Sequence, residues 1–222
     1  MTEQVVASQD TKARDLFRAA YENRYTWDHD FPGYSADVTL KRGAEEFTGQ
    51  VLIKSDMKAE ILNVEDEQAK KEIGEQAWEI AIHRVRRTFE QTHSQNTFTL
   101  GETDETGAVE ILMGGKAAGD RYKVRNNEVC LVHRHIHGTV VTINTFSSHP
   151  TEAGYLSHRY DSAYHDPTTG ELKGESSFED HYEKVGNYYA LNNRRIVSTH
   201  NGETITTEFS FTNIKLLQPA TV

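Results

Sequence analysis

The sequence predicts an α+β protein: a large curved antiparallel sheet, half-barrel or barrel-like, covered by an N-terminal helix and by one long helix after the third strand. Two early segments, residues 10–25 and 66–89, repeat apolar side chains with the period of a helix, and the chain after Ser94 alternates apolar with polar residues between polar turns. A sheet of about a dozen strands usually curls or closes. We therefore expect an apolar concave side beneath the two helices.

The first part of the chain predicts a helix, three strands and a second helix. Residues 10–25 carry an apolar stripe that includes Leu16 and Phe17, and residues 34–40, 47–53 and 58–62 form the strands. The second helix should run from about residue 66 to 89 and bury one apolar face. The residues expected on that face are Ile73, Ala77, Ile80, Ala81, Val85 and Phe89, with Trp78 and Ile82 widening it on one side.

The remainder predicts a series of short strands joined by turns. The clearest hairpin turn is Asn201-Gly202, because both residues accept the left-handed backbone that a tight turn requires. The expected strands are residues 97–100, 108–113, 122–125, 129–137, 139–146, 155–164, about 178–183, 195–200 and 204–216.

Composition limits the class of protein. The 222 residues fit a single domain, residues 1–222, and 36% hydrophobic residues are enough for a core. The formal net charge of -10 opposes binding to nucleic acid. A single cysteine, Cys130, excludes an intramolecular disulfide, and no run of about 18 apolar residues predicts a membrane span. We expect an acidic cytoplasmic protein.

Three histidines suggest a metal site. His133, His135 and His137 alternate in a predicted strand, so their imidazoles should project from one face, and neutral imidazole is a good ligand for zinc or a similar divalent ion. A straight strand separates His133 from His137 by about 13 Å, too far for one ion. A further ligand would have to come from a neighbour such as His149, His158 or His200. A half-exposed polar face explains the same pattern without a metal.

A second group of residues suits the wall of an amphipathic cavity. His158, Tyr160, Ser162 and Tyr164 should share one face of a strand, and Tyr182 belongs to the same His- and Tyr-rich stretch of the sequence. A planar or partly polar ligand could stack on these rings and bond to the hydroxyls. Tyrosines at the margin of a sheet, with their hydroxyls in water, explain the same pattern without a ligand.

The segment ARDLFRAAYENRYTW, residues 13–27, followed by DFPGY at residues 30–34, resembles an uncharacterised family of cyanobacterial proteins with plastid relatives. The resemblance implies a photosynthetic organism and a cytoplasmic or thylakoid-facing setting, and it assigns no catalytic residue. The order of the predicted elements also resembles the half-barrel carriers of the bacterial lipoprotein-localisation type, whose curved sheet holds acyl chains.

Three functions remain open from the sequence. The favoured one is a non-enzymatic carrier that holds an apolar or amphipathic molecule, such as a pigment, tetrapyrrole or lipid, at His158, Tyr160, Tyr164 and Tyr182. The first alternative is a metal-dependent enzyme that uses the strand with His133, His135 and His137. The second is an assembly factor that binds another protein through its acidic surface.

Overall fold

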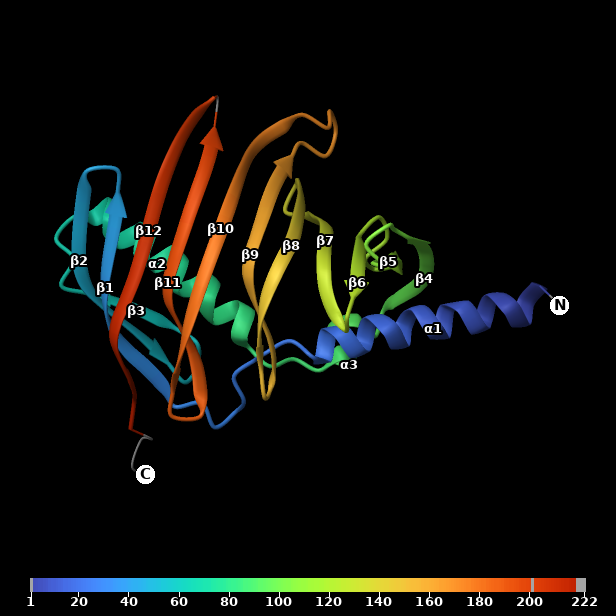
Figure 1. Ribbon diagram of the computed structural model, residues 1–222, viewed down its shortest axis with the longest axis horizontal. Coiled ribbons are helices and arrows are strands. Elements are labelled where there is room, and N and C mark those ends of the chain that lie inside the picture. Colours follow the sequence, from blue (N-terminus) through green and yellow to red (C-terminus); the bar gives the residue numbers. More distant parts are fainter. Residues whose placement is uncertain (1, 201, 219–222) are drawn as a thin grey trace. The chain divides into compact units, whose positions relative to one another are not determined.

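The computed structural model describes residues 2–200 and 202–218, and these form two compact units (Figure 1). Unit 1 consists of Met1–Tyr25 and Arg87–Ser177, and unit 2 consists of Thr26–Arg86 and Phe178–Val222. That the chain forms a single domain stays a prediction.

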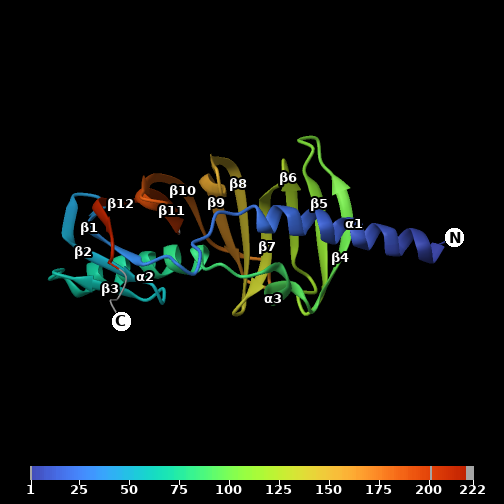
Figure 2. The same cartoon turned by 90° about the horizontal axis from the view of Figure 1, so that it is seen from below.

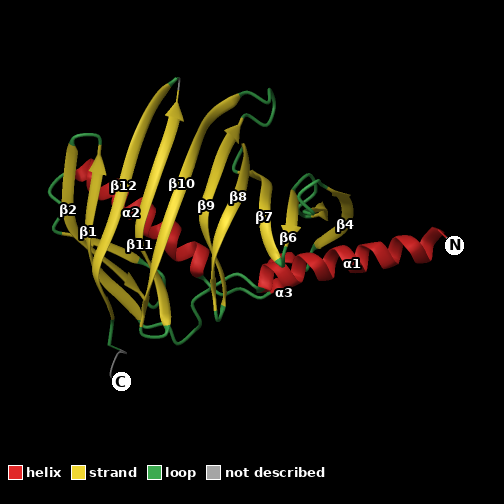
Figure 3. Ribbon diagram, in the orientation of Figure 1, coloured by secondary structure: helices red, strands yellow, loops and turns green. Residues whose placement is uncertain are grey.

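The described residues contain three helices and twelve strands (Figure 3). The helices are α1 (Thr2–Glu22), α2 (Glu67–Arg84) and α3 (Phe89–His93). The strands are β1 (Gly33–Arg42), β2 (Glu45–Lys54), β3 (Ala59–Leu62), β4 (Asn96–Thr103), β5 (Val109–Gly115), β6 (Arg121–Arg125), β7 (Glu128–Ile136), β8 (Thr139–Thr151), β9 (Gly154–His165), β10 (Leu172–Val185), β11 (Tyr188–His200) and β12 (Glu203–Leu216).

Hydrogen-bonded neighbours follow the order β3-β2-β1-β12-β11-β10 in unit 2 and β10-β9-β8-β7-β6-β5-β4 in unit 1, and β10 contributes residues to both units. The strand pairings with a determined register are antiparallel. The sheet is open, since β3 and β4 lie at its edges, and β10, β11 and β12 bend visibly along their length (Figure 1). The predicted fold class, an α+β protein with a curved antiparallel sheet, an N-terminal helix and a long helix after the third strand, is confirmed.

In unit 2 the alternation of β1 places its apolar residues under α2. Val38 and Leu40 are fully buried and pair with Phe211 and Phe209 of β12, which are also buried. Asp66 starts α2, because its side chain accepts a hydrogen bond of 2.7 Å from the backbone N–H of Ala69. The buried face of α2 consists of Ala69, Ile73, Ala77, Ile80 and Ala81.

In unit 1 the helices α1 and α3 pack against β4, β5 and β6. Figure 2 shows α1 crossing these strands. The buried core there is Ala13, Phe17, Ala20, Tyr21, Phe89, Phe98, Ile111, Met113, Tyr122 and Val124. His93 of α3 lies in the same core, with its ring 5.1 Å from those of Phe17 and Phe89. Burial, together with the positive charges of Arg24 and Arg134, lowers the pKa of His93 to about 4.

The prediction for the second helix was wrong in two respects. The helix ends at Arg84, because Val85 is extended, and Thr88 begins a separate helix through a capping box with Gln91. Trp78 does not widen the buried face, because its side chain is 60% exposed, and Ile82 is exposed as well.

Several strands are longer than predicted. β10 starts at Leu172 rather than near Phe178, and β11 starts at Tyr188 rather than at Arg195. β11 and β12 pair as an antiparallel hairpin whose last residue pair is His200 and Glu203. Asn201, the first residue of the predicted turn, and the side chain of His200 lie outside the described residues.

Candidate functional site

The register of β7, β8 and β9 defines which side chains of unit 1 share a face. Val132 pairs with Ile143, and Ile143 pairs with Ser162, so these three point to the same side. Val132 packs against the core that α1 covers. This side is therefore the inner face of unit 1. Tyr160 and Val141 belong to it too, since residues two apart on a strand share a face.

The inner face changes character along the sheet of unit 1. The strand residues of its buried core come from β4, β5 and β6, with Val129 and Val132 of β7 packed against them. On β8, every residue from Thr139 to Thr145 is half-buried, without the alternation of a strand that has one covered face. We define the open inner face as the part of this surface outside the α1 core. Its residues are Val141, Ile143, His149, His158, Tyr160 and Tyr164.

Three of the four predicted ligand-binding residues come together on the open inner face. His158, Tyr160 and Tyr164 alternate along β9 with Ser162, and the Ser162 hydroxyl donates a 3.4 Å hydrogen bond to the Tyr164 hydroxyl. Ser162 is buried, whereas 38% of Tyr164 is exposed. This surface therefore combines aromatic rings and hydroxyl groups with the aliphatic side chains of β8.

Tyr182, the fourth predicted residue, belongs to β10 in unit 2. Its hydroxyl donates a hydrogen bond of 3.3 Å to Asp180 and accepts one of 3.2 Å from Arg84. Burial raises the pKa of the Tyr182 phenol. Tyr182 therefore takes part in an ionic network between α2 and the sheet of unit 2, and its role in ligand binding stays a prediction.

The most buried part of that network is the ion pair of Arg194 and Asp180. The guanidinium group donates two hydrogen bonds, of 2.8 and 2.7 Å, to the two carboxylate oxygens. It also donates to Gln76 at 3.0 Å and to Glu79 at 3.1 Å on α2. A bidentate charged pair with further hydrogen bonds fixes the position of the helix over β10 and β11.

The predicted metal ligands lie elsewhere in unit 1. His133 and His135 are neighbours on β7, with ring centroids 5.9 Å apart. The Nδ1 atom of His133 is 2.8 Å from the Thr142 hydroxyl, and that of His135 is 3.3 Å from Asp120. Burial, with a smaller effect of the Arg121 charge, lowers the pKa of His133.

His137 does not continue this row, because β7 ends at Ile136 and His137 has a left-handed backbone with φ of 49° in the following turn. The three imidazoles therefore do not project from one straight strand. Metal binding by His133, His135 and His137 stays a prediction.

A different pair of histidines is in direct contact. His149 of β8 and His158 of β9 have ring centroids 4.4 Å apart and an interplanar angle of 32°. Ser147 lies 3.3 Å from Nδ1 of His158. The register of β8 and β9 shifts on either side of Ser147. From the sequence, His158 was predicted to bind a small molecule, and both His149 and His158 were named as possible further ligands of a metal held by the His133 strand. Their contact with each other was not predicted, because the sequence of one strand does not show where its pairing with the next strand is irregular.

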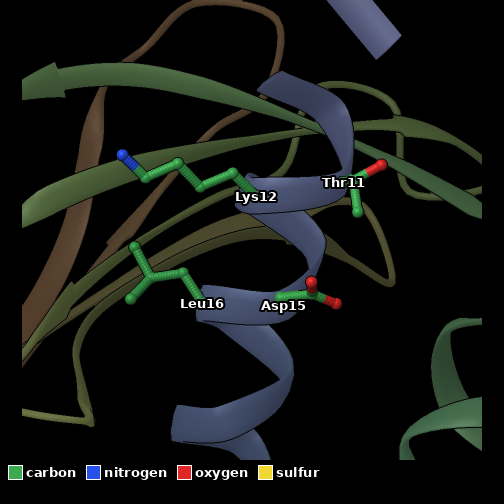
Figure 4. A pocket seen from close by; sticks show the side chains of 4 residues that line it. All are labelled: Thr11, Lys12, Asp15 and Leu16. Carbon is green, nitrogen blue, oxygen red and sulfur yellow. The ribbon is translucent and has the colours of Figure 1, made fainter. Parts of the chain in front are cut away.

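One surface depression lies on α1 of unit 1. Figure 4 shows Thr11, Lys12, Asp15 and Leu16 lining it from neighbouring turns of that helix, and the depression is open to solvent. All four residues belong to the helix and none to a strand, so a ligand there would be bound from one side only. The open inner face offers side chains from two adjacent strands.

No helix in the described part of the chain is both long enough and apolar enough to cross a bilayer. The fold and the open inner face define a class: an α+β protein with an open antiparallel sheet that presents amphipathic side chains. The chain belongs to the family described as Protein of unknown function (DUF3386), whose model matches residues 8–217. The predicted membership of a family without assigned activity is thereby confirmed, whereas its cyanobacterial setting stays a prediction.

Two solved structures contain chains that are distantly similar to this one. A DUF1329 family protein from Desulfovibrio piger is 8% identical, with a TM-score of 0.28, over 94% of this chain and 93% of that one. A LolA superfamily protein from Nitrosomonas europaea is 7% identical, with a TM-score of 0.28, over 93% of this chain and 94% of that one. Similarity at this level supports no functional argument. A comparison with curated proteins gives no match.

Proposed function

We propose that this protein is a binding or carrier module that holds an apolar or amphipathic small molecule, such as a pigment, tetrapyrrole or lipid, on the open inner face of unit 1. One observation carries the proposal. Aliphatic side chains of β8 and aromatic side chains of β9 share a surface that lies beyond the core under α1 and is only half-buried. Binding of a ligand that removes half-buried apolar surface from water lowers the free energy.

The chemistry of this surface favours an amphipathic ligand over a purely apolar one. Val141 and Ile143 provide an aliphatic floor, and Tyr160 and Tyr164 provide ring faces on which a planar or acyl group packs. The tyrosine hydroxyls and the imidazole of His158 place hydrogen-bonding groups along the same strand. A ligand with one polar end therefore satisfies both parts of the surface.

Native mass spectrometry of protein purified gently from its own host tests the proposal directly. A bound molecule of constant mass, identified as a pigment, tetrapyrrole or lipid, is the expected result. Protein that carries no such molecule, and that binds neither a fluorescent fatty acid nor protoporphyrin in titrations, contradicts it.

Adjacent valines provide matched variants for locating the site. Val141 points to the inner face, whereas Val140, which pairs with His135 and His165, points to the other side of the same strand. Val141→Glu should weaken binding of the fatty acid probe at least about tenfold, because ligand binding would then desolvate a carboxylate. Val140→Glu should leave binding nearly unchanged. Equal effects of the two variants would place the ligand elsewhere.

A further inference from the structure

The contact between His149 and His158 in unit 1 suggests a function that the apolar part of the surface does not explain. Both imidazoles are half-buried, and they meet across two adjacent strands with ring centroids 4.4 Å apart. Regular antiparallel pairing does not produce this contact alone, because the register of β8 with β9 shifts between Thr145 and Ser147 and again between Ser147 and Ser148. Such bulges change the direction of a side chain and occur frequently beside functional sites.

We propose that His149 and His158 form a binding site for a divalent transition-metal ion. Their ligating ring nitrogens lie within 4.8 Å of each other. Two nitrogens bound to one tetrahedral ion, with bonds of about 2.0–2.1 Å, lie roughly 3.4 Å apart. Small rotations of the two side chains bridge this difference. The site shares His158 with the surface proposed for the ligand, but it needs neither Tyr160 nor Tyr164.

The surroundings of His158 favour one particular ligating atom. Its Nδ1 lies 3.3 Å from the Ser147 hydroxyl, which can accept the Nδ1 proton. A proton on Nδ1 leaves the lone pair on Nε2. A hydrogen bond of this kind, from the non-ligating nitrogen to a neighbouring group, is the usual way in which a metal-binding histidine is oriented.

The ligand set determines which ions fit. Two neutral imidazoles without a thiolate suit copper, nickel and zinc, and the general order of affinities places Cu²⁺ above Zn²⁺. Mg²⁺ and Ca²⁺ prefer oxygen ligands and should not compete. The formal net charge of -10 attracts cations to the protein as a whole.

Calorimetric titration of tag-free, metal-free protein with Cu²⁺, Zn²⁺ and Mg²⁺ tests the site. We expect one Cu²⁺ per chain, weaker Zn²⁺ binding and no Mg²⁺ binding. Either His149→Ala or His158→Ala should weaken Cu²⁺ binding at least about tenfold, since the loss of groups that only orient a ligand already costs 10–100-fold.

The matched control is the double variant His133→Ala with His135→Ala, the other pair of neighbouring histidines in unit 1. It should retain Cu²⁺ binding. Loss of binding in this control, or unchanged binding in both His149→Ala and His158→Ala, overturns the proposal.

A measurement on the unaltered protein covers the case in which a variant fails to fold. Substoichiometric Cu²⁺ broadens the NMR signals of the imidazole C–H groups closest to it. The signals of His149 and His158 should broaden first. Broadening of other histidine signals at a lower amount of Cu²⁺ would overturn the proposal.

Discussion

Replacement of Asp180 by alanine should strongly destabilise unit 2. The Asp180 side chain is 1% exposed and that of its partner, Arg194, is 7% exposed, and two short hydrogen bonds join them. The variant removes the bidentate carboxylate partner of a buried guanidinium group, whose remaining hydrogen bonds include those to Gln76 and Glu79 on α2. Removal of one partner from a buried ion pair typically costs about 3–5 kcal/mol.

A double variant separates the cost of losing Asp180 alone from the value of the Asp180–Arg194 pair. Asp180→Leu with Arg194→Met replaces both partners by apolar side chains, and such replacements are often neutral or stabilising. We expect the double variant to recover most of the stability lost in Asp180→Ala. The difference arises because the buried charge is removed along with its partner.

Tryptophan fluorescence provides a selective assay. The sequence has two tryptophans, and both Trp27 and Trp78 belong to unit 2. Trp27 is fully buried, so its emission should shift when unit 2 unfolds in urea. The midpoint of Asp180→Ala should fall by at least about 1 M, since slopes of about 1–3 kcal/mol/M are typical. A loss below about 1 kcal/mol, or a double variant less stable than Asp180→Ala, would refute the reasoning.

Three further predictions test single features. An unfolded histidine titrates near 6.5, whereas the folded protein holds the pKa of His93 at about 4; the unfolded chain therefore takes up the proton first as the pH falls. As the pH falls between these values, the free energy of unfolding of unit 1 should decrease by up to about 3 kcal/mol. In urea unfolding followed by circular dichroism, His93→Gln should make the stability less dependent on pH. Asp66→Ala removes the N-cap of α2 and should cost about 1 kcal/mol by tryptophan fluorescence, whereas Asp66→Asn should cost less. Gly154→Ala should lower the melting temperature of unit 1 by calorimetry, because φ is 123° and a Cβ atom would collide with the carbonyl oxygen of Asn23; an unchanged melting temperature would contradict this packing.

Local patterns in the sequence predicted the elements, because the period of apolar residues is a property of one segment. The alternation of Tyr34, Ala36, Val38 and Leu40 matches a strand whose alternate residues are buried. The break after Arg84 was missed although a signal existed. Thr88 and Gln91 have the spacing of a capping box, which marks a new helix start inside the apolar repeat.

Strand lengths were harder to predict where neighbouring strands decide them. The first half of β10, from Leu172 to Ser177, has little apolar alternation. Backbone hydrogen bonds to an adjacent strand extend such a segment regardless of its side chains. The pattern of residues within the segment therefore does not show that it forms these hydrogen bonds.

The sequence by itself determined the α+β class, the order of the strands and of the two longer helices, and the shared face of His158, Tyr160 and Tyr164 on β9. Only the tertiary structure decided which strand lies beside that face, and so brought Val141, Ile143 and His149 of β8 to it. It also separated Tyr182 into unit 2, where Arg84 and Asp180 bind its hydroxyl. The physical reason is that periodicity acts within a segment, whereas the register and irregularities between strands depend on contacts between residues distant in the chain.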